Sequence, residues 1–266
     1  MSFFYERTKN NYTSPLLSHN FASFNQNRSH LKNIVEYIPI ITSLFSIFFA
    51  NEIYRHYRNK RTTYLLWWTI GVVTFGLGTF AESINILFGW SAFNVKYWYI
   101  VGALLGGFPL AQGSVYLLMH RKFANTTSVI FITLIVTAAI AVILTPLRIP
   151  AGFNYKLTGA VFAWKWVRFF SPFINTYSFI FLVGGAVYSA VKYFRRKDKG
   201  ARFKGNVYIS IGSLLPGIGG TFTRMGYVNV LFVTELIGLA LIYIGYRIIK
   251  ADGSRDYQYS PKLKEG

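Results

Sequence analysis

Residues 63–88 read TYLLWWTIGVVTFGLGTFAESINILF, and this stretch decides the fold class of the chain. It is apolar along its length and carries one charged residue, Glu82. An α-helix needs about 20 such residues to cross about 30 Å of hydrocarbon. The apolar residues form a block rather than following the period of an amphipathic helix or strand. The stretch therefore predicts a transmembrane helix.

Six further blocks of similar length and character accompany it. Only 14% of the 266 residues are charged and 53% are hydrophobic, whereas soluble domains average about 25% charged residues. Backbone groups in lipid must satisfy one another, which favours helices. We therefore predict an all-α membrane protein, a bundle of seven transmembrane helices at 34–55, 63–88, 97–119, 127–146, 167–193, 205–223 and 228–249.

The predicted domain organisation is a polar tail at 1–33, a seven-helix transmembrane domain at 34–249 and a tail at 250–266. No cleavable signal peptide is visible, because the first apolar run begins too late. The net charge is +19, with 10 Lys and Arg residues on one side of the predicted spans and 18 on the other. The positive-inside rule then predicts a cell-membrane protein with an extracytoplasmic N-terminus and a cytoplasmic C-terminus.

The basic run KYFRRKDKGARFK, Lys192 to Lys204, dominates this asymmetry. Its charge has two interpretations, a topology signal beside anionic lipid or a nucleic-acid contact, and we favour the first. Membrane lipids are therefore expected partners and nucleic acid is not. The stretch LTGAVFAWKW, Leu157 to Trp166, is too short to span and predicts an interfacial or re-entrant segment.

Two glycine-rich motifs end in opposite charges. GLGTFAE ends at Glu82, and GIGGTFTRMG, Gly217 to Gly226, contains Arg224 after the same Thr-Phe pair. For most of these glycines, helix packing is favoured over ligand contact. The motifs are compatible with an internal repeat of the second-third and sixth-seventh helices, but they are too short to establish one.

A layer of charged residues is predicted in the outer half of the bundle. At 1.5 Å per residue, Glu82 and Glu235 lie about 9 and 10 Å below the outer helix ends. Glu36 is placed at the start of the first helix, Arg168 at the start of the fifth and Arg224 at the end of the sixth. Charged groups within a membrane mark candidate functional sites. Glu52 lies at the opposite end, where Arg55 and Arg58 are its expected partners.

Small and polar residues follow helical spacing on three predicted helices. Such stripes should face one another or a wet cavity rather than lipid. Asn175 lies on one of them and joins the candidate site residues. The stripes are Gly71, Gly78, Glu82 and Asn85; Arg168, Ser171, Asn175, Ser178, Gly185 and Ser189; and Asn206, Ser210, Ser213, Gly217, Thr221 and Arg224. Pro216, beside three glycines, makes the sixth helix the expected place for a break.

Several chemistries have no residues to support them. The chain has no cysteine, and its four histidines lie outside the predicted membrane core. Thiolate sites, bis-histidine haem and histidine-rich di-iron centres are therefore not expected. No metal, cofactor or catalytic residue is predicted, and an enzyme is less favoured than a binding protein.

KYWYIVGALLGGFPLAQGSVYLL, Lys96 to Leu118, LVGGAVYSA, Leu182 to Ala190, and GNVYISIG, Gly205 to Gly212, resemble a group of bacterial seven-helix integral membrane proteins. The resemblance covers the second to seventh helices loosely and rests on small and aromatic residues. It implies the seven-helix topology and no activity, because none is assigned to the group.

These features predict a protein that binds or transports a small molecule or a lipid through a polar site in the outer half. The alternatives are a non-catalytic structural subunit of a larger membrane complex, with protein partners, and a lipid-modifying enzyme using Glu82 or Glu235 as base. Within the site, Glu82 and Arg224 are expected to form a charge pair that Glu235 shares. Arg224 reaching to the outer headgroups is the competing interpretation.

Overall fold

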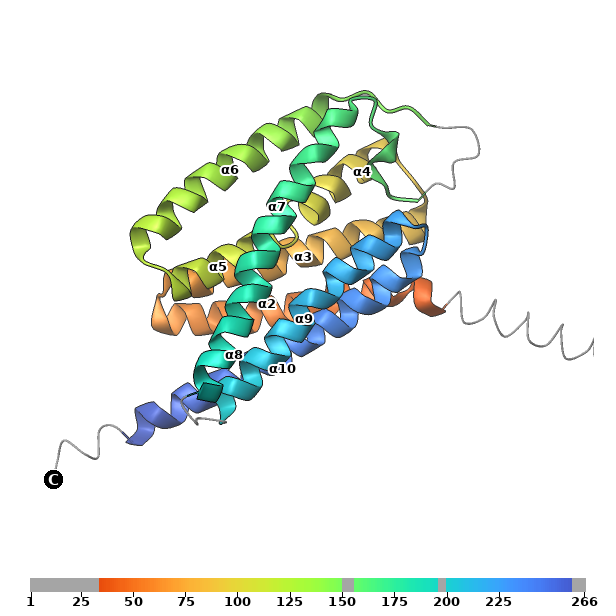
Figure 1. Cartoon of the computed structure of the whole chain (residues 1–266). Coiled ribbons are helices and arrows are strands. Elements are labelled where there is room, and N and C mark those ends of the chain that lie inside the picture. Colours follow the sequence, from red (N-terminus) through yellow and green to blue (C-terminus); the bar gives the residue numbers. More distant parts are fainter. Residues whose placement is uncertain (1–33, 150–155, 196–199, 260–266) are drawn as a thin grey trace, which may run out of the picture.

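The computed structural model describes residues 34–149, 156–195 and 200–259 as an all-α bundle of seven helices. Figure 1 shows α6 at one edge of the bundle and α10 at the other, with α7 and α8 running obliquely across it. The helical segments are α2 (Ile38–Lys60), α3 (Thr63–Phe88), α4 (Ala92–Trp98), the π-helix η1 (Tyr99–Leu104), α5 (Phe108–Leu118), α6 (Arg121–Leu144), the short η2 (Gly159–Val161) and η3 (Lys165–Phe169), α7 (Phe170–Ser178), the π-helix η4 (Phe179–Gly184), α8 (Gly185–Arg195), α9 (Ala201–Arg224) and α10 (Val228–Tyr259).

Within the described residues, six helices are long and apolar enough to cross a membrane, at 34–60, 63–88, 92–118, 121–144, 165–195 and 228–252. The span at 92–118 joins α4, η1 and α5, and the span at 165–195 joins η3, α7, η4 and α8. The span at 34–60 begins four residues before α2. α9 has 24 residues, but its Arg, Lys, Asn and Ser residues dilute its apolar content. The structure thus supports a multi-pass helical membrane protein, and a seventh crossing by α9 stays a prediction. α10 continues past the predicted helix end at 249 to Tyr259.

The surface of the bundle is apolar, as a lipid-facing surface requires. Large apolar side chains are exposed on every long helix, among them Ile47, Phe80, Val136, Tyr188 and Ile244. A soluble monomer rarely exposes continuous apolar areas of this extent. Contact with the hydrocarbon of a membrane removes the free-energy cost of exposing these side chains to water.

The predicted small-residue face of α3 packs on the third span. Gly71 lies against Leu110 of α5, and a Cβ atom at Gly78 would lie 3.1 Å from the Cα of Gly102 in η1. Such close backbone approach is what small residues permit between membrane helices. It brings the outer part of α3, including Glu82, into contact with the beginning of the third span.

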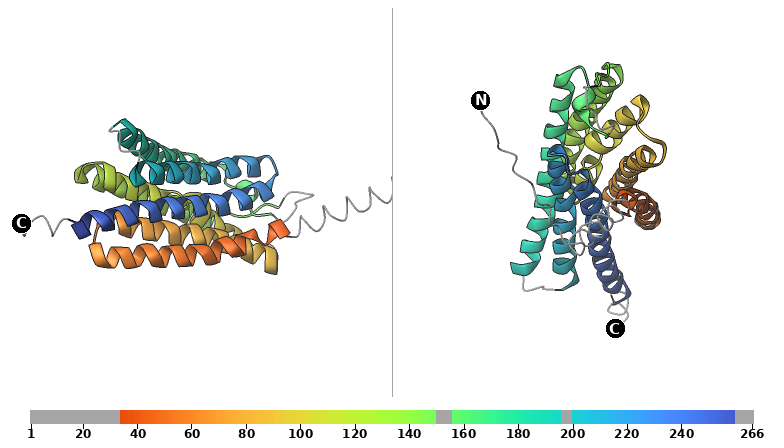
Figure 2. Two further views of the ribbon diagram at one scale, coloured as in Figure 1. Left: turned by 90° about the horizontal axis from the view of Figure 1, so that it is seen from below. Right: turned by 90° about the vertical axis from the view of Figure 1, so that its right-hand side faces the viewer.

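α9 and α10 lie side by side along their length (Figure 2). A Cβ atom at Gly212 would lie 2.6 Å from the carbonyl oxygen of Gly238, and the reverse distance is the same. Gly205, Gly219 and Gly245 make similar close approaches, so glycines seven residues apart form this interface. The packing role predicted for the glycines is therefore correct at Gly219. Gly217 and Gly220 have no neighbour within 4 Å of a Cβ position.

The polar stripe of α9 faces the bundle only in part, because Ser210 lies toward α8 while the positions nearer the end of α9 are open to the surface. Gly217 and Thr221 are exposed. The side chains of Asn206, Ser213 and Thr221 bond to carbonyl oxygens four residues earlier in their own helix. Because these polar groups are satisfied locally, they need no inward partner.

The expected break at Pro216 is also absent, since α9 continues as an α-helix through this residue. The third span is interrupted instead, between η1 and α5 at residues 105–107. The segment at 157–166 contains the short helix η2 and the beginning of η3, and it does not span. Phe162 in it is buried against the ring of Tyr99, with ring centroids 4.9 Å apart.

Candidate functional site: a pair of buried carboxyl groups

Glu82 lies on α3, six residues before the helix ends, and only 5% of it is exposed. The indole Nε1–H of Trp98 donates a hydrogen bond of 3.1 Å to its Oε1 atom. Trp98 is the last residue of α4, and the close approach of Gly78 to Gly102 holds this part of the chain against α3. The packing of two glycines thus positions the donor for a buried carboxyl group.

Glu235 lies on α10, seven residues after the helix begins, and its carboxyl group interacts directly with that of Glu82. The predicted common depth of these two residues therefore corresponds to physical contact. Oε2 of each carboxyl group is enclosed by protein and, among the described residues, has no hydrogen-bond partner. Most buried polar atoms in proteins do have one.

Two facing carboxyl groups carry a definite chemical requirement. If both are ionised in a medium of low dielectric constant, they repel strongly. The repulsion is relieved by a cation between them, which can be a proton, a metal ion or a cationic group of an organic molecule. The free Oε2 atoms provide the acceptors for such a cation. The arrangement is suited to binding positive charge.

The other predicted site residues lie in different surroundings. Arg168 in η3 and Glu36 at the beginning of the first span are exposed. The backbone of Arg224 ends α9, but its side chain lies outside the part of the structure that is described. Its pairing with Glu82 therefore stays a prediction. Of the six candidates, the structure brings Glu82 and Glu235 together.

Asn175 on α7 bonds to the interrupted third span. Its Nδ2 atom donates to the carbonyl oxygen of Ala103 at 3.4 Å and to Ser171 Oγ at 3.0 Å. Ser171 Oγ donates to the same carbonyl at 3.3 Å, and Thr74 Oγ1 donates to that of Leu105 at 3.5 Å. Irregular backbone at membrane depth is tolerated where neighbouring side chains satisfy it. In this structure Asn175 is one of the side chains that donate hydrogen bonds to this irregular backbone.

Sequence reasoning missed two residues of this region. Neither Trp98 nor Asn94 is among the residues that the sequence pattern predicts for the site. Asn94 is 2% exposed and donates from Nδ2 to the carbonyl oxygen of Ala81 at 2.8 Å, while its enclosed Oδ1 has no partner in the described part of the chain. A helix-terminal Asn and Trp four residues apart share a helix face, and this spacing was the available signal.

A second buried polar cluster lies between α5, α6 and α7. Gln112, which is fully buried, donates from Nε2 to the carbonyl oxygen of Ala124 at 2.8 Å. Its Oε1 accepts a 2.6 Å hydrogen bond from the Tyr177 hydroxyl and a longer one, 3.5 Å, from Thr127. This cluster was not predicted either. All its polar side-chain atoms have partners.

Glu52, near the other end of the bundle, pairs across helices. Its carboxyl oxygens lie 3.1 Å from Lys250 Nζ and 3.4 Å from Arg247 Nη1, both on α10. The expected pairing with Arg55 and Arg58 on its own helix is wrong. α10 packs directly against α2, so its cations are closer than those along α2.

Two apolar grooves open on the surface of the bundle. One lies between α8 and α9, and the other is lined by Phe131, Leu134, Trp166, Phe169, Phe170 and Phe173. Neither is lined by Glu82 or Glu235.

No protein-family model, curated protein or solved structure matches this chain. The resemblance to bacterial seven-helix proteins thus identifies no family. The geometry of the side chains is the basis for a functional assignment.

Proposed function

We propose that this membrane protein binds or transports a small molecule or a lipid, and that the Glu82–Glu235 pair holds the cationic group or coupling cation. The observation that carries the proposal is the contact between two buried carboxyl groups, each with an enclosed oxygen lacking a partner. An ionisable residue within a membrane span is costly to maintain. A bound cation offsets this cost for the two buried carboxyl groups.

The thermal stability of the purified protein tests this proposal. A ligand that binds only the folded state raises the unfolding temperature according to its concentration. Unfolding is measured with Na⁺, K⁺, choline and a cationic amphiphile at equal ionic strength. At least one of them should raise the Tm of the wild type, and Glu82→Gln and Glu235→Gln should abolish that rise.

Glu36→Gln is the matched control, because it removes an exposed carboxyl group from the first span. It should leave the cation-dependent rise unchanged. Equal responses of wild type, Glu82→Gln and Glu235→Gln to every cation in the panel would contradict the proposal.

The orientation of the site belongs to the same proposal. The excess of Lys and Arg in the loops beside α8 and α9 supports a cytoplasmic location for that end and an extracytoplasmic one for Glu82 and Glu235. The natural chain has no cysteine, so one cysteine placed at Lys204 gives a unique label site. An impermeant thiol reagent should label it only after the cells are opened. Labelling in intact cells would reverse the orientation.

A second candidate function is that of a structural subunit of a membrane complex. On α9, Gly217 and Gly220 have open space where a Cβ atom would lie, and Thr221 next to Gly220 in the chain is exposed. Small residues on an outward helix face favour contact with another helix. A single cysteine at Gly217 should then cross-link to a second protein in native membranes, while one at Ile140 on α6 should not. If neither position cross-links to protein, the subunit role loses its support.

A further inference from the structure

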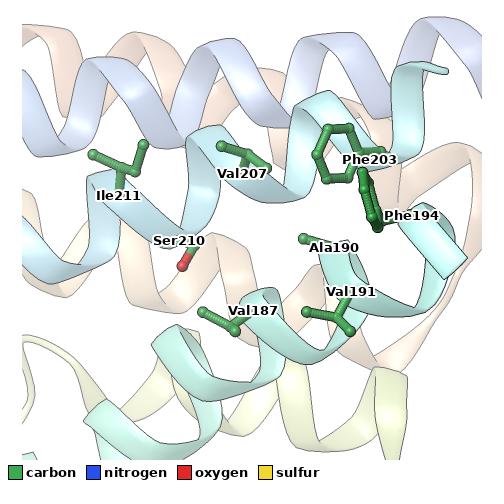
Figure 3. A pocket seen from close by; sticks show the side chains of 8 residues that line it. All are labelled: Val187, Ala190, Val191, Phe194, Phe203, Val207, Ser210 and Ile211. Carbon is green, nitrogen blue, oxygen red and sulfur yellow. The ribbon is translucent and has the colours of Figure 1, made fainter. Parts of the chain in front are cut away.

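The groove between α8 and α9 is apolar and open to the surface of the bundle (Figure 3). Its volume is about 270 Å³. Figure 3 shows the ring of Phe194 from α8 next to that of Phe203 from α9, and Ser210 of α9 directed toward α8. The lining residues are Val187, Ala190, Val191 and Phe194 of α8 and Phe203, Val207, Ser210 and Ile211 of α9.

The groove narrows where Phe194 and Phe203 meet, with ring centroids 5.6 Å apart. This aromatic pair lies close to the end of α8 and the beginning of α9. The remaining lining residues lie further along the two helices, within the apolar part of the bundle. An occupant of the groove therefore contacts apolar side chains along the two helices and reaches the helix ends beside the aromatic pair.

Cations extend both walls of the groove at that end. Arg195 follows Val191 by four residues, and Lys204 precedes Val207 by three, so each continues a lining face by about one turn. Both are exposed. Arg202 differs from them, because its guanidinium lies 3.1 Å from the carboxylate of Asp252.

We infer that this groove is a specific site for an anionic phospholipid, with an acyl chain along the apolar walls and the phosphate between Arg195 and Lys204. Basic pockets between transmembrane helices bind anionic lipid headgroups in this way. The charge at the groove end selects the headgroup, and the apolar lining accepts the chain. The site is separate from Glu82 and Glu235, and it does not depend on their function.

Native mass spectrometry of the full-length protein, titrated with phosphatidylglycerol or phosphatidylcholine, measures the selectivity. Phosphatidylglycerol should bind more tightly. The double variant Arg195→Gln/Lys204→Gln should weaken its binding roughly 30-fold, from about 1 kcal/mol for each lost cation. Arg121→Gln/Lys122→Gln removes two exposed cations at the start of α6 and should change nothing.

A second pair of variants tests the groove itself. Val187→Trp fills it from a position 46% exposed, whereas Val136→Trp adds the same bulk at a position 51% exposed on α6. Only Val187→Trp should weaken phosphatidylglycerol binding. A photo-crosslinker at Val187 should label lipid in native membranes.

Three results would overturn the inference. They are equal affinity for the two lipids, unchanged binding by the Arg195 and Lys204 double variant, and recovery of a cross-linked protein instead of lipid at Val187. The last would assign the groove to a partner helix.

Discussion

The two buried polar clusters of this bundle differ in how completely their atoms are satisfied. Gln112 uses its amide nitrogen and oxygen in hydrogen bonds that join α5 to α6 and α7. Glu82 and Glu235 face each other with an enclosed, unpartnered oxygen on each side. Both clusters are buried in apolar surroundings. Every polar side-chain atom of the first cluster has a partner, whereas each carboxyl group of the second keeps one oxygen without a partner among the described residues.

This difference distinguishes buried polar groups that stabilise the fold from buried polar groups that bind a ligand. A fully bonded network stabilises the bundle, and removing a member leaves others unsatisfied. A cluster that lacks a partner lowers the stability of the empty protein and gains stability when its ligand binds. Substitutions in the two clusters should therefore have opposite effects on stability, and the following predictions test that contrast.

Gln112→Ala should have the largest effect, a loss of about 3 kcal/mol in the free energy of unfolding. The substitution leaves a cavity at a fully buried position and removes the partner of the Tyr177 hydroxyl. Denaturation in mixed micelles measures the change. Thr221→Ala, at an exposed position that bonds within its own helix, serves as the control. A loss at Gln112 no larger than that of the control would show that the network is not structural.

Tyr177→Phe should lower the free energy of unfolding by about 1.5 kcal/mol. It removes one hydroxyl, which donates at 2.6 Å to Gln112 Oε1, and keeps the aromatic ring in place. Thr127 remains as a weaker donor at 3.5 Å. The same denaturation assay applies. In the background of Gln112→Ala, the substitution should cost almost nothing, and additive losses would mean that the two side chains are not coupled.

Asn175→Ala tests whether a predicted site residue belongs to the structural class. We expect a loss of about 1 kcal/mol, because the Ala103 carbonyl keeps Ser171 as its remaining donor. The cation-dependent rise in Tm should stay as in the wild type. If this rise disappears while stability is unchanged, Asn175 contacts the ligand instead.

Trp98→Phe should have the smallest effect on stability, about 0.6 kcal/mol, the typical value for one hydrogen bond between membrane helices. The substitution removes the donor to Glu82 Oε1 and retains most of the ring. Its larger consequence should be a changed cation selectivity, read from the Tm panel. Trp90→Phe, at the loop after α3, is the control and should leave selectivity unaltered.

The fold could be predicted from the sequence because hydrocarbon thickness fixes the length of a membrane helix. The block at 63–88 became α3 with the same bounds. The rise per residue placed Glu82 and Glu235 at a common level, and the structure brings their carboxyl groups together. Which faces meet could not be predicted in this way. On α9, Gly205, Gly212 and Gly219 face α10, while the polar stripe bonds to its own backbone.

The contacts between the residues of the site could also not be predicted from the sequence. Trp98 reaches Glu82 because the backbones of Gly78 and Gly102 are in close contact. Helical periodicity within each segment does not predict how the two segments align. Glu52 shows the same limit, since spacing along α2 indicated Arg55 and Arg58 and neglected α10. Proline was a partial guide, because Pro109 lies in the first turn of α5, directly after the interruption at residues 105–107, whereas α9 continues through Pro216.

The most direct test of the account is the stability of Glu82→Gln, Glu235→Gln and the double variant in the absence of added ligand cations. An amide in place of one carboxyl group removes the repulsion and can donate to the other. Each single variant should therefore equal or exceed the wild type in free energy of unfolding, by up to about 1 kcal/mol for the hydrogen bond gained. A loss of about 3–5 kcal/mol in either would contradict the account, because removing one partner of a satisfied buried ion pair has that cost. The pair would then already be neutralised within the chain, with Arg224 as the predicted cation.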